Sequence, residues 1–173
     1  MLSKDMKELI RVFNEQGVEY LLVGGYAFGV HAQPRATKDL DLFIRASARN
    51  SDAVFRALCQ YGAPLGGLTV KDFRDAKTGL QIGVPPNRID ILQQISGVTF
   101  DEAWKDHVSA IIEGDTPTYV ISRENLIKNK LAAGREQDIL DVKQIQKAAF
   151  YAPEQPTRKT GKLKKKKRKR IER

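Results

Sequence analysis

Apolar positions recur along the chain at two spacings, and each spacing predicts a different kind of element. In residues 4–16 the apolar side chains are separated by three or four positions, at Met6, Leu9, Ile10 and Phe13. This spacing is typical of one face of an α-helix, and Gly17 is a natural end for it. Residues 18–23 are instead short, β-branched and aromatic, which indicates a buried strand. The pattern predicts an amphipathic helix followed by a core strand.

Two later segments alternate polar and apolar side chains. They are residues 39–45, DLDLFIR, which alternate only at their start, and residues 88–92, RIDIL. A period of two predicts strands, and the first of them should have one solvated end. Before the first of them, Gly24 and Gly25 open a turn into a short helix, and a loop at 33–37 returns the chain. A strand, a glycine turn, a short helix and a second strand are therefore expected in close succession.

The remaining segments predict both helices and strands. We expect helices at 51–61, 101–106, 123–133 and 136–149, strands at 69–73 and 80–84, and a hairpin at 108–122 that turns at Gly114-Asp115. Strands and helices that alternate irregularly favour an α/β (α+β) fold, with a mixed sheet flanked by helices and a C-terminal helical pair.

The same pattern predicts how the chain is divided. We expect one domain at 1–152, with a core at about 18–121 and C-terminal helices at 122–150. A disordered tail is expected at 153–173, because its last seventeen residues are charged and of low complexity.

Net charge first suggests a nucleic-acid-binding protein, because the formal value is +9. Of the 30 Lys and Arg, eleven lie in residues 157–173, together with one of the 21 Asp and Glu. Residues 1–156 therefore hold 19 basic and 20 acidic side chains. The excess positive charge belongs to the tail, and the expected folded body is close to neutral.

The single cysteine, Cys59, excludes a disulfide framework or a cysteine-based metal site within these residues. Its place on the apolar side of the helix expected at 51–61 predicts a core position. No apolar run approaches the roughly 20 residues needed to cross a bilayer, and the N-terminus lacks an apolar signal core. We expect a soluble, cytoplasmic protein with no membrane partner.

Three aspartates are candidates for chemistry. Asp39 and Asp41 lie two apart on a predicted strand, so both project from one face. Close carboxylates repel each other, and Mg²⁺, which prefers oxygen ligands and leaves positions for phosphates, relieves this repulsion. The alternative is a solvated strand edge. If the strand that carries Asp90 lies beside them, the three carboxylates can hold two metal ions.

Gly24 and Gly25 are candidates for binding phosphate. A strand that runs into a glycine turn and a helix presents backbone N–H groups, which favour anions. The alternative is a tight turn in which glycine only relieves steric crowding. The segment is not a P-loop, because no Gly-Lys-Ser/Thr follows, and it contains no G-x-G-x-x-G. His31, on the short helix, is predicted to be structural.

Taken together, these motifs resemble those of the nucleotidyltransferase superfamily, whose fold is like the polymerase-β palm. VGG at 23–25, an interval of thirteen residues and DLD at 39–41 match its pattern. HAQPRATKDLDL at 31–42 is similar to the R-x-T-x-D-h-D segment, where h is apolar, of small stand-alone members from abortive-infection and toxin–antitoxin systems. ENLIKNKLAAGREQDILDV at 124–142 is similar to their K-L-x-A-x-R-x-x-D-h-x-D segment. The resemblance covers about residues 18–145.

The resemblance implies roles for the central residues. Gly24 and Gly25 would bind the triphosphate of a nucleoside triphosphate, which is the substrate. The catalytic residues, which would also form a two-metal Mg²⁺ site, would be Asp39, Asp41 and Asp90. Asp90 would in addition be a general base for the acceptor hydroxyl.

The C-terminal segment is implied to complete the nucleotide site. Lys130 matches the lysine expected to touch the triphosphate, with a solvated helix lysine as the alternative. Asp138 and Asp141 would position this lysine or the nucleotide, or else form a salt bridge with Arg135. Arg35 either contacts phosphate or pairs with an aspartate near the site.

The implied reaction is attack of an acceptor hydroxyl on the α-phosphorus, with pyrophosphate leaving. The tail at 157–173 favours RNA such as tRNA as acceptor, with a solubilising tail or a nuclear-import signal as alternatives. A protein acceptor, such as a cognate toxin or antitoxin, is a further alternative. An aminoglycoside is less favoured, because no acidic domain is evident. The rival hypothesis is an inactive nucleotidyltransferase-like module that binds RNA or a partner protein.

Overall fold

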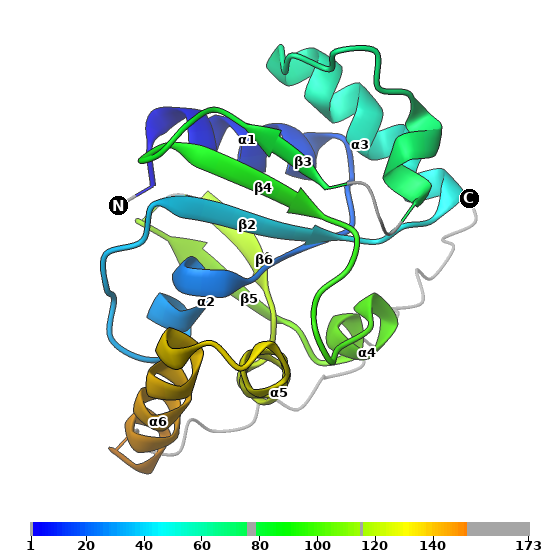
Figure 1. The fold of residues 1–173 in the computed structure, drawn as a ribbon. Coiled ribbons are helices and arrows are strands. Elements are labelled where there is room, and N and C mark those ends of the chain that lie inside the picture. Colours follow the sequence, from blue (N-terminus) through cyan, green and yellow to red (C-terminus); the bar gives the residue numbers. More distant parts are fainter. Residues whose placement is uncertain (1, 76–78, 115, 152–173) are drawn as a thin grey trace, which may run out of the picture.

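The computed structural model describes residues 2–75, 79–114 and 116–151 (Figure 1). Its centre is a mixed sheet with the strand order β3-β4-β2-β1-β6-β5. In chain order the strands are Tyr20–Leu22, Asp39–Ile44, Leu80–Ile82, Arg88–Leu92, Val108–Ile112 and Thr116–Val120, numbered β1 to β6. The pairs β2/β4 and β1/β6 are parallel, and the pairs β1/β2, β3/β4 and β5/β6 are antiparallel. The predicted mixed α/β fold is confirmed.

Helices cover both faces of this sheet. They are α1 Lys4–Glu15, α2 Gly24–His31, α3 Ala48–Tyr61, α4 Phe100–Lys105, α5 Arg123–Ala133 and α6 Glu136–Tyr151, with a 3₁₀ helix η1 at Val70–Arg74. In Figure 1, α1 lies behind the sheet and α2 lies in front of it. The helix α3 packs against α1, whereas α5 and α6 pack against each other and against α2. The predicted C-terminal helical pair is therefore present.

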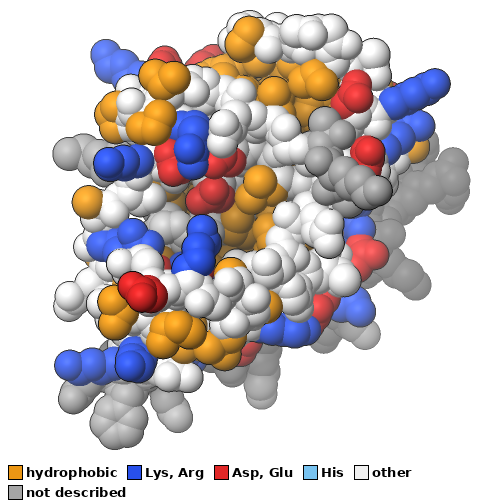
Figure 2. Space-filling view, in the orientation of Figure 1, with side chains coloured by type: hydrophobic (Ala, Val, Ile, Leu, Met, Phe, Trp, Pro, Cys, Tyr) orange, Lys and Arg blue, Asp and Glu red, His pale blue; other side chains and the backbone are white. Residues whose placement is uncertain are grey.

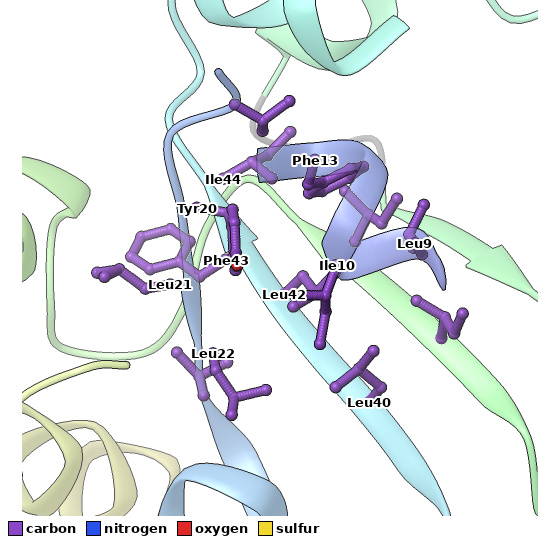
Figure 3. Close-up of a cluster of buried hydrophobic side chains, with 14 of the residues drawn as sticks. Leu9, Ile10, Phe13, Tyr20, Leu21, Leu22, Leu40, Leu42, Phe43 and Ile44 are labelled. Carbon is purple, nitrogen blue, oxygen red and sulfur yellow. The ribbon is translucent and has the colours of Figure 1, made fainter. Parts of the chain in front are cut away.

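Alternation along β2 separates the core from the candidate site. Leu40 and Leu42 are fully buried beneath α1, among its core side chains Leu9, Ile10 and Phe13 (Figure 3). Because successive side chains of a strand point to opposite faces, Asp39 and Asp41 project from the other face, on which α2 lies. The buried leucines thereby set the direction of both carboxylates.

Side-chain caps decide where several helices begin. Ser3, Ser47, Thr99 and Ser122 each accept a hydrogen bond from a backbone N–H in the first turn of the helix that follows. The cap at Ser47 explains why α3 begins at Ala48, three residues before the predicted start. The expected hairpin at 108–122 is present as β5 and β6, although Asp115 lies outside the described residues.

The prediction of a strand at 69–73 is wrong, because the chain forms the 3₁₀ helix η1 there. Thr69 caps this helix, and its backbone N–H and hydroxyl both donate to Oδ2 of Asp72. These local hydrogen bonds compete with strand pairing, and Phe73 is the one fully buried side chain of the segment. The strand predicted at 80–84 is present but ends at Ile82, before Gly83 with φ +76°.

The predicted core position of Cys59 is also wrong, because this side chain is exposed. The buried stripe of α3 includes Ala53, Val54, Ala57 and Leu58. Cys59 follows this stripe by one residue, which turns it about 100° away from the core.

Two further observations bear on the predicted organisation. None of the helices in the described residues is long and apolar enough to cross a membrane. The tail predicted at 153–173 lies outside the described residues.

Candidate functional site

The three predicted carboxylates meet on two neighbouring strands. β2 and β4 are parallel, and in their register Asp41 lies opposite Asp90, whereas Asp39 lies opposite Arg88. Adjacent strands are about 4.8 Å apart, so residues in register are direct neighbours. The sequence left open whether the strand of Asp90 lies beside that of Asp39 and Asp41, and the structure places it there. The carboxylates thus form one acidic cluster, which we define as Asp39, Asp41 and Asp90.

Arg88 is the basic partner of the acidic cluster. Its Nη2 lies 2.7 Å from Oδ2 of Asp39 and 3.1 Å from Oδ2 of Asp90. The second oxygen of each of these carboxylates, Oδ1, is buried and has no hydrogen-bond partner in the described structure. Arg88 therefore satisfies one oxygen of each carboxylate and leaves the other without a partner.

The carboxyl group of Asp41 has a strongly altered proton affinity. Burial, together with the negative charges of Asp90 and Asp39, raises its pKa to about 6. Arg135 and Arg88 act in the opposite direction but do not cancel the effect. A raised pKa of this origin is expected for a buried carboxyl group that faces other carboxylates.

The two glycines allow the chain to approach the acidic cluster closely. Gly24 begins α2 with φ +63°, and a Cβ there would collide with the carboxylate of Asp41. A Cβ on Gly25 would lie 2.5 Å from the hydroxyl oxygen of Thr37. Val23, at the N-cap, makes no side-chain cap. The backbone N–H groups at this helix start therefore lie beside Asp41, in a position suited to a phosphate.

One cleft is lined by all the predicted catalytic and nucleotide-binding residues, whereas Asp141 lies behind them as a partner of Lys130. The cleft has a volume of about 810 Å³ and is lined by, among others, Gly24, Gly25, Arg35, Asp39, Asp41, Asp90, Lys130 and Asp138. Figure 2 shows acidic side chains with basic ones beside them in this region, where β2 and β4 approach the C-terminal helices. The fold brings together residues that are more than a hundred positions apart in the sequence.

Lys130 is buried on α5, with only 4% of its side chain exposed. Its Nζ donates to Asp138 at 3.0 Å and to Asp141 at 2.7 Å, both on α6. The predicted alternative of a solvated lysine is therefore wrong. In this structure the two aspartates hold the lysine in place, and Arg135 also pairs with Asp138, at 2.7 Å. Both aspartates thus pair with Lys130, and the salt bridge with Arg135 forms at Asp138 alone.

Arg35 extends this network to the loop before β2. Its Nε and Nη2 lie 3.1 and 2.9 Å from the two oxygens of Asp141, which confirms its pairing with an aspartate near the site. Burial would raise the pKa of Asp141, but hydrogen bonds from Arg35, Lys130 and Gln137 outweigh it, so that the pKa is lowered. Asp141 is therefore held as a carboxylate.

Asp138 is held in the same way, since bonds from Arg135 and Lys130 outweigh burial and lower its pKa. His31 lies outside the cleft lining, and its Nε2 contacts the carbonyl oxygen of Ile121 at 2.7 Å, as expected of a structural residue.

The acidic cluster fits a divalent cation by its chemistry. Three carboxylates supply the hard oxygen atoms that Mg²⁺ prefers, and the partnerless Oδ1 atoms of Asp39 and Asp90 are acceptors that such a cation would satisfy. In the structure as described, however, no group of three or more acidic, histidine or cysteine side chains converges on one point. The pairing of Arg88 with two of the three carboxylates is consistent with this.

Several cleft residues were not predicted. Arg88 lies two positions before Asp90 on the same strand, so the period of two that placed Asp90 on the polar face also places Arg88 there. That signal was present in the sequence. The cleft lining also includes the uncharged polar residues Gln94, Ser96 and Asn129. They come from a loop and a helix, and no local pattern indicates their convergence.

Comparison with known proteins identifies the chain at the level of family. A family model described as "Nucleotidyltransferase of unknown function (DUF6036)" matches residues 1–149. No curated protein matches the sequence. A similar solved structure is that of an antigenic nucleotidyltransferase-like protein from Paracoccidioides brasiliensis, with 16% identity and a TM-score of 0.48. That match covers 90% of this chain and 81% of the other.

Proposed function

The chain belongs to the DUF6036 family of nucleotidyltransferases of unknown function, and from this premise we propose that it is an active, Mg²⁺-dependent nucleotidyltransferase. It would transfer a nucleoside monophosphate from a nucleoside triphosphate to an acceptor hydroxyl. The observation that supports the proposal most is the register of β2 and β4, which sets Asp41 opposite Asp90. Gly24, at the start of α2, lies against the carboxylate of Asp41.

Each part of the cleft has a role in this proposal. The backbone N–H groups of Gly24 and Gly25 donate to the triphosphate, and the carboxylates of the acidic cluster are the ligands for Mg²⁺. When bound, Mg²⁺ would supply positive charge against the phosphate oxygens. Asp90 accepts the proton of the acceptor hydroxyl as the new P–O bond forms and the bond to pyrophosphate breaks. Catalysis then depends on positioning and charge, and the proposed reaction needs no covalent intermediate with the protein.

The C-terminal helices close the cleft in this proposal. Arg135 lines the cleft with 77% of its side chain exposed, and it and Lys130 lie where a triphosphate would extend from Gly24. Lys130 is already paired with Asp138 and Asp141, so in this proposal its Nζ divides its hydrogen bonds between these carboxylates and the phosphate. Arg35 holds Asp141 and thereby ties the loop before β2 to α6.

The acceptor is proposed to be an RNA such as tRNA, held by the tail at 157–173, or a protein such as a cognate toxin or antitoxin. Membership of a toxin–antitoxin or phage-defence system would suit either acceptor. Support for these assignments comes from the motifs at 31–42 and 124–142 and from the basic charge of the tail.

A second function, an inactive module that binds RNA or a partner protein, is favoured by one observation. Arg88 pairs with two of the three carboxylates, and the cluster does not converge on a metal position in the described structure. The two functions differ in one property, which is transfer of a labelled nucleotide.

A labelled-nucleotide screen tests the choice. The protein is incubated with Mg²⁺ and each of four α-³²P nucleoside triphosphates, in the presence of total tRNA, a cell lysate or no added acceptor. We expect label on one acceptor class, and a loss of at least a hundredfold, about 3 kcal/mol in transition-state stabilisation, in Asp39→Asn and Asp41→Asn.

The matched control is Asp52→Asn, which removes an exposed carboxylate that faces Arg74 outside the cleft. It should transfer label at the wild-type rate. If the wild-type protein labels nothing with any nucleotide, the enzyme proposal fails and the binding module is preferred.

A further inference from the structure

We propose that Arg88 is a built-in counter-ion of the acidic cluster, which competes with divalent cations for Asp39 and Asp90 and moves to the triphosphate when a nucleotide binds. This inference rests on the proposed function, because it concerns the same carboxylates. It adds a coupling between nucleotide and metal that neither the family description nor the motifs assign.

The position of Arg88 follows from the sheet. It lies two residues before Asp90 on β4, and the parallel register sets it opposite Asp39 on β2. Its side chain therefore leaves the same face as both carboxylates and reaches each of them through one nitrogen, Nη2. Because Arg88 is tethered beside these carboxylates, its effective concentration there is high, and it competes with a free divalent cation for them.

The contacts of Arg88 are nevertheless incomplete. Nη2 serves Oδ2 of both Asp39 and Asp90, whereas Nε of Arg88 and the Oδ1 atoms of both carboxylates are buried without hydrogen-bond partners in the described structure. A fork-shaped guanidinium binds carboxylate best through two parallel hydrogen bonds, and this arrangement does not use that mode. A partly satisfied buried network is costly, which makes exchange of this partner feasible.

The charges indicate what would complete the exchange. Three carboxylates carry a formal charge of −3, of which Arg88 balances one through Asp39 and Asp90, whereas a divalent cation in its place would balance two. Arg88 also lines the cleft together with Gly24 and Gly25, where the triphosphate is proposed to lie. A bound nucleotide would therefore offer Arg88 phosphate oxygens at the moment that a cation takes its place between Asp39 and Asp90.

Such an exchange makes the two ligands interdependent. Metal alone must displace Arg88 into solvent and binds weakly, whereas metal together with nucleotide leaves Arg88 paired. Because coupling between two sites is reciprocal, nucleotide should strengthen metal binding by the same factor by which metal strengthens nucleotide binding.

The test is Mn²⁺ binding to the full chain, measured by electron paramagnetic resonance and calorimetry, for wild type and Arg88→Gln. Without nucleotide we expect Arg88→Gln to bind Mn²⁺ roughly tenfold more tightly than wild type, within the usual range of coupling factors. A non-hydrolysable α,β-methylene triphosphate should strengthen Mn²⁺ binding strongly in wild type and only weakly in Arg88→Gln. Arg88→Lys, which keeps the charge, should stay close to wild type.

The matched control is Arg45→Gln. Arg45 also pairs with two carboxylates, Glu19 and Asp101, but it does not line the cleft. This variant should bind Mn²⁺ like wild type. Melting in EDTA supplies a second measurement, in which Arg88→Gln should melt lower than wild type and recover on addition of Mg²⁺, since the cation replaces the missing charge.

Each outcome decides a different point. Equal or weaker Mn²⁺ binding by Arg88→Gln overturns the counter-ion proposal and leaves the nucleotidyltransferase proposal to the label-transfer screen. An absence of Mn²⁺ binding in every variant, with or without nucleotide, overturns both. A third outcome is that Arg88→Gln binds Mn²⁺ more tightly than wild type, but nucleotide strengthens Mn²⁺ binding by the same factor in both proteins. Arg88 then competes with the cation without coupling it to the nucleotide, which overturns the proposed transfer of Arg88 to phosphate.

Discussion

Burial and the negative charges of Asp90 and Asp39 both raise the pKa of the Asp41 carboxyl group, from the ordinary value of 3.8 to about 6. A carboxyl group with a higher pKa in the folded than in the unfolded state binds its proton more tightly when folded. Its contribution to stability is therefore fully present below about pH 4 and is lost as the pH rises through about 6.

We predict that Asp41→Asn is more stable than wild type at pH 8 in EDTA, by about 1 to 3 kcal/mol, since each pKa unit corresponds to about 1.4 kcal/mol. The amide carries no charge, so the repulsion from Asp90 and Asp39 disappears. Urea unfolding at intervals from pH 4 to pH 8 measures the difference, which should vanish near pH 4. A difference that does not depend on pH would contradict the assignment, and Asp52→Asn should show no such trend.

At the scale of single residues, the sequence indicated which residues are candidates for the site better than it indicated what they contact. Asp39, Asp41 and Asp90 were singled out as candidates from spacing and polarity alone, whereas Arg88 carried the same period-of-two signal and was not singled out. Cys59 was placed wrongly in the core, because a single step along a helix changes the direction of a side chain by about 100°.

At the scale of elements, α5 and α6 pack against each other and are joined by charge. Between the helices, Lys130 is enclosed by Asp138 and Asp141, whose side chains are at most 4% exposed. Lys130 thus joins α5 to α6, which contributes Gln137 and Asp138 to the cleft lining.

We predict that Lys130→Met destabilises the protein by roughly 3 kcal/mol, because removal of one partner leaves buried carboxylates without part of their compensation. Urea unfolding at pH 7 measures the loss. Asp138 retains Arg135 and Asp141 retains Arg35, so the protein should still fold.

Lys128→Met is the matched control on the same helix. Its partner, Glu102, is exposed like Lys128 itself, so the loss should stay below about 1 kcal/mol. If Lys130→Met instead keeps wild-type stability but loses nucleotide affinity, Lys130 acts mainly on phosphate and not as a tie between the helices.

At the scale of the whole molecule, charge is divided between a nearly neutral body and a basic tail. Eleven Lys and Arg lie in residues 157–173, which are outside the described residues. The cleft holds its own charges of both signs. Any electrostatic hold on RNA by the tail would therefore be separable from nucleotide binding.

We predict that deletion of 157–173 weakens RNA binding and flattens its salt dependence. The log–log slope should fall by about 0.7 for each phosphate of a single-stranded RNA that the tail neutralises. Filter binding to total tRNA from 50 to 300 mM salt measures the slope. The melting temperature of the body should not change.

A tail with the same composition in shuffled order is the control, and it should keep the wild-type slope, since the interaction depends on charge and not on sequence. An unchanged slope after deletion would remove the tail from RNA binding.

The sequence by itself determined the periodic elements, the Gly-Gly turn and the Asp-x-Asp strand, because each depends on residues close together in the chain. Even there, local hydrogen bonds at Thr69 made a helix where a strand was expected. Only the tertiary structure decided that β4 lies beside β2 in the register that joins Asp41 to Asp90, that Arg88 stands between two carboxylates, and that Lys130 is buried. These contacts join segments distant in the sequence, and strand order and register depend on the packing of the whole sheet, which no local pattern specifies.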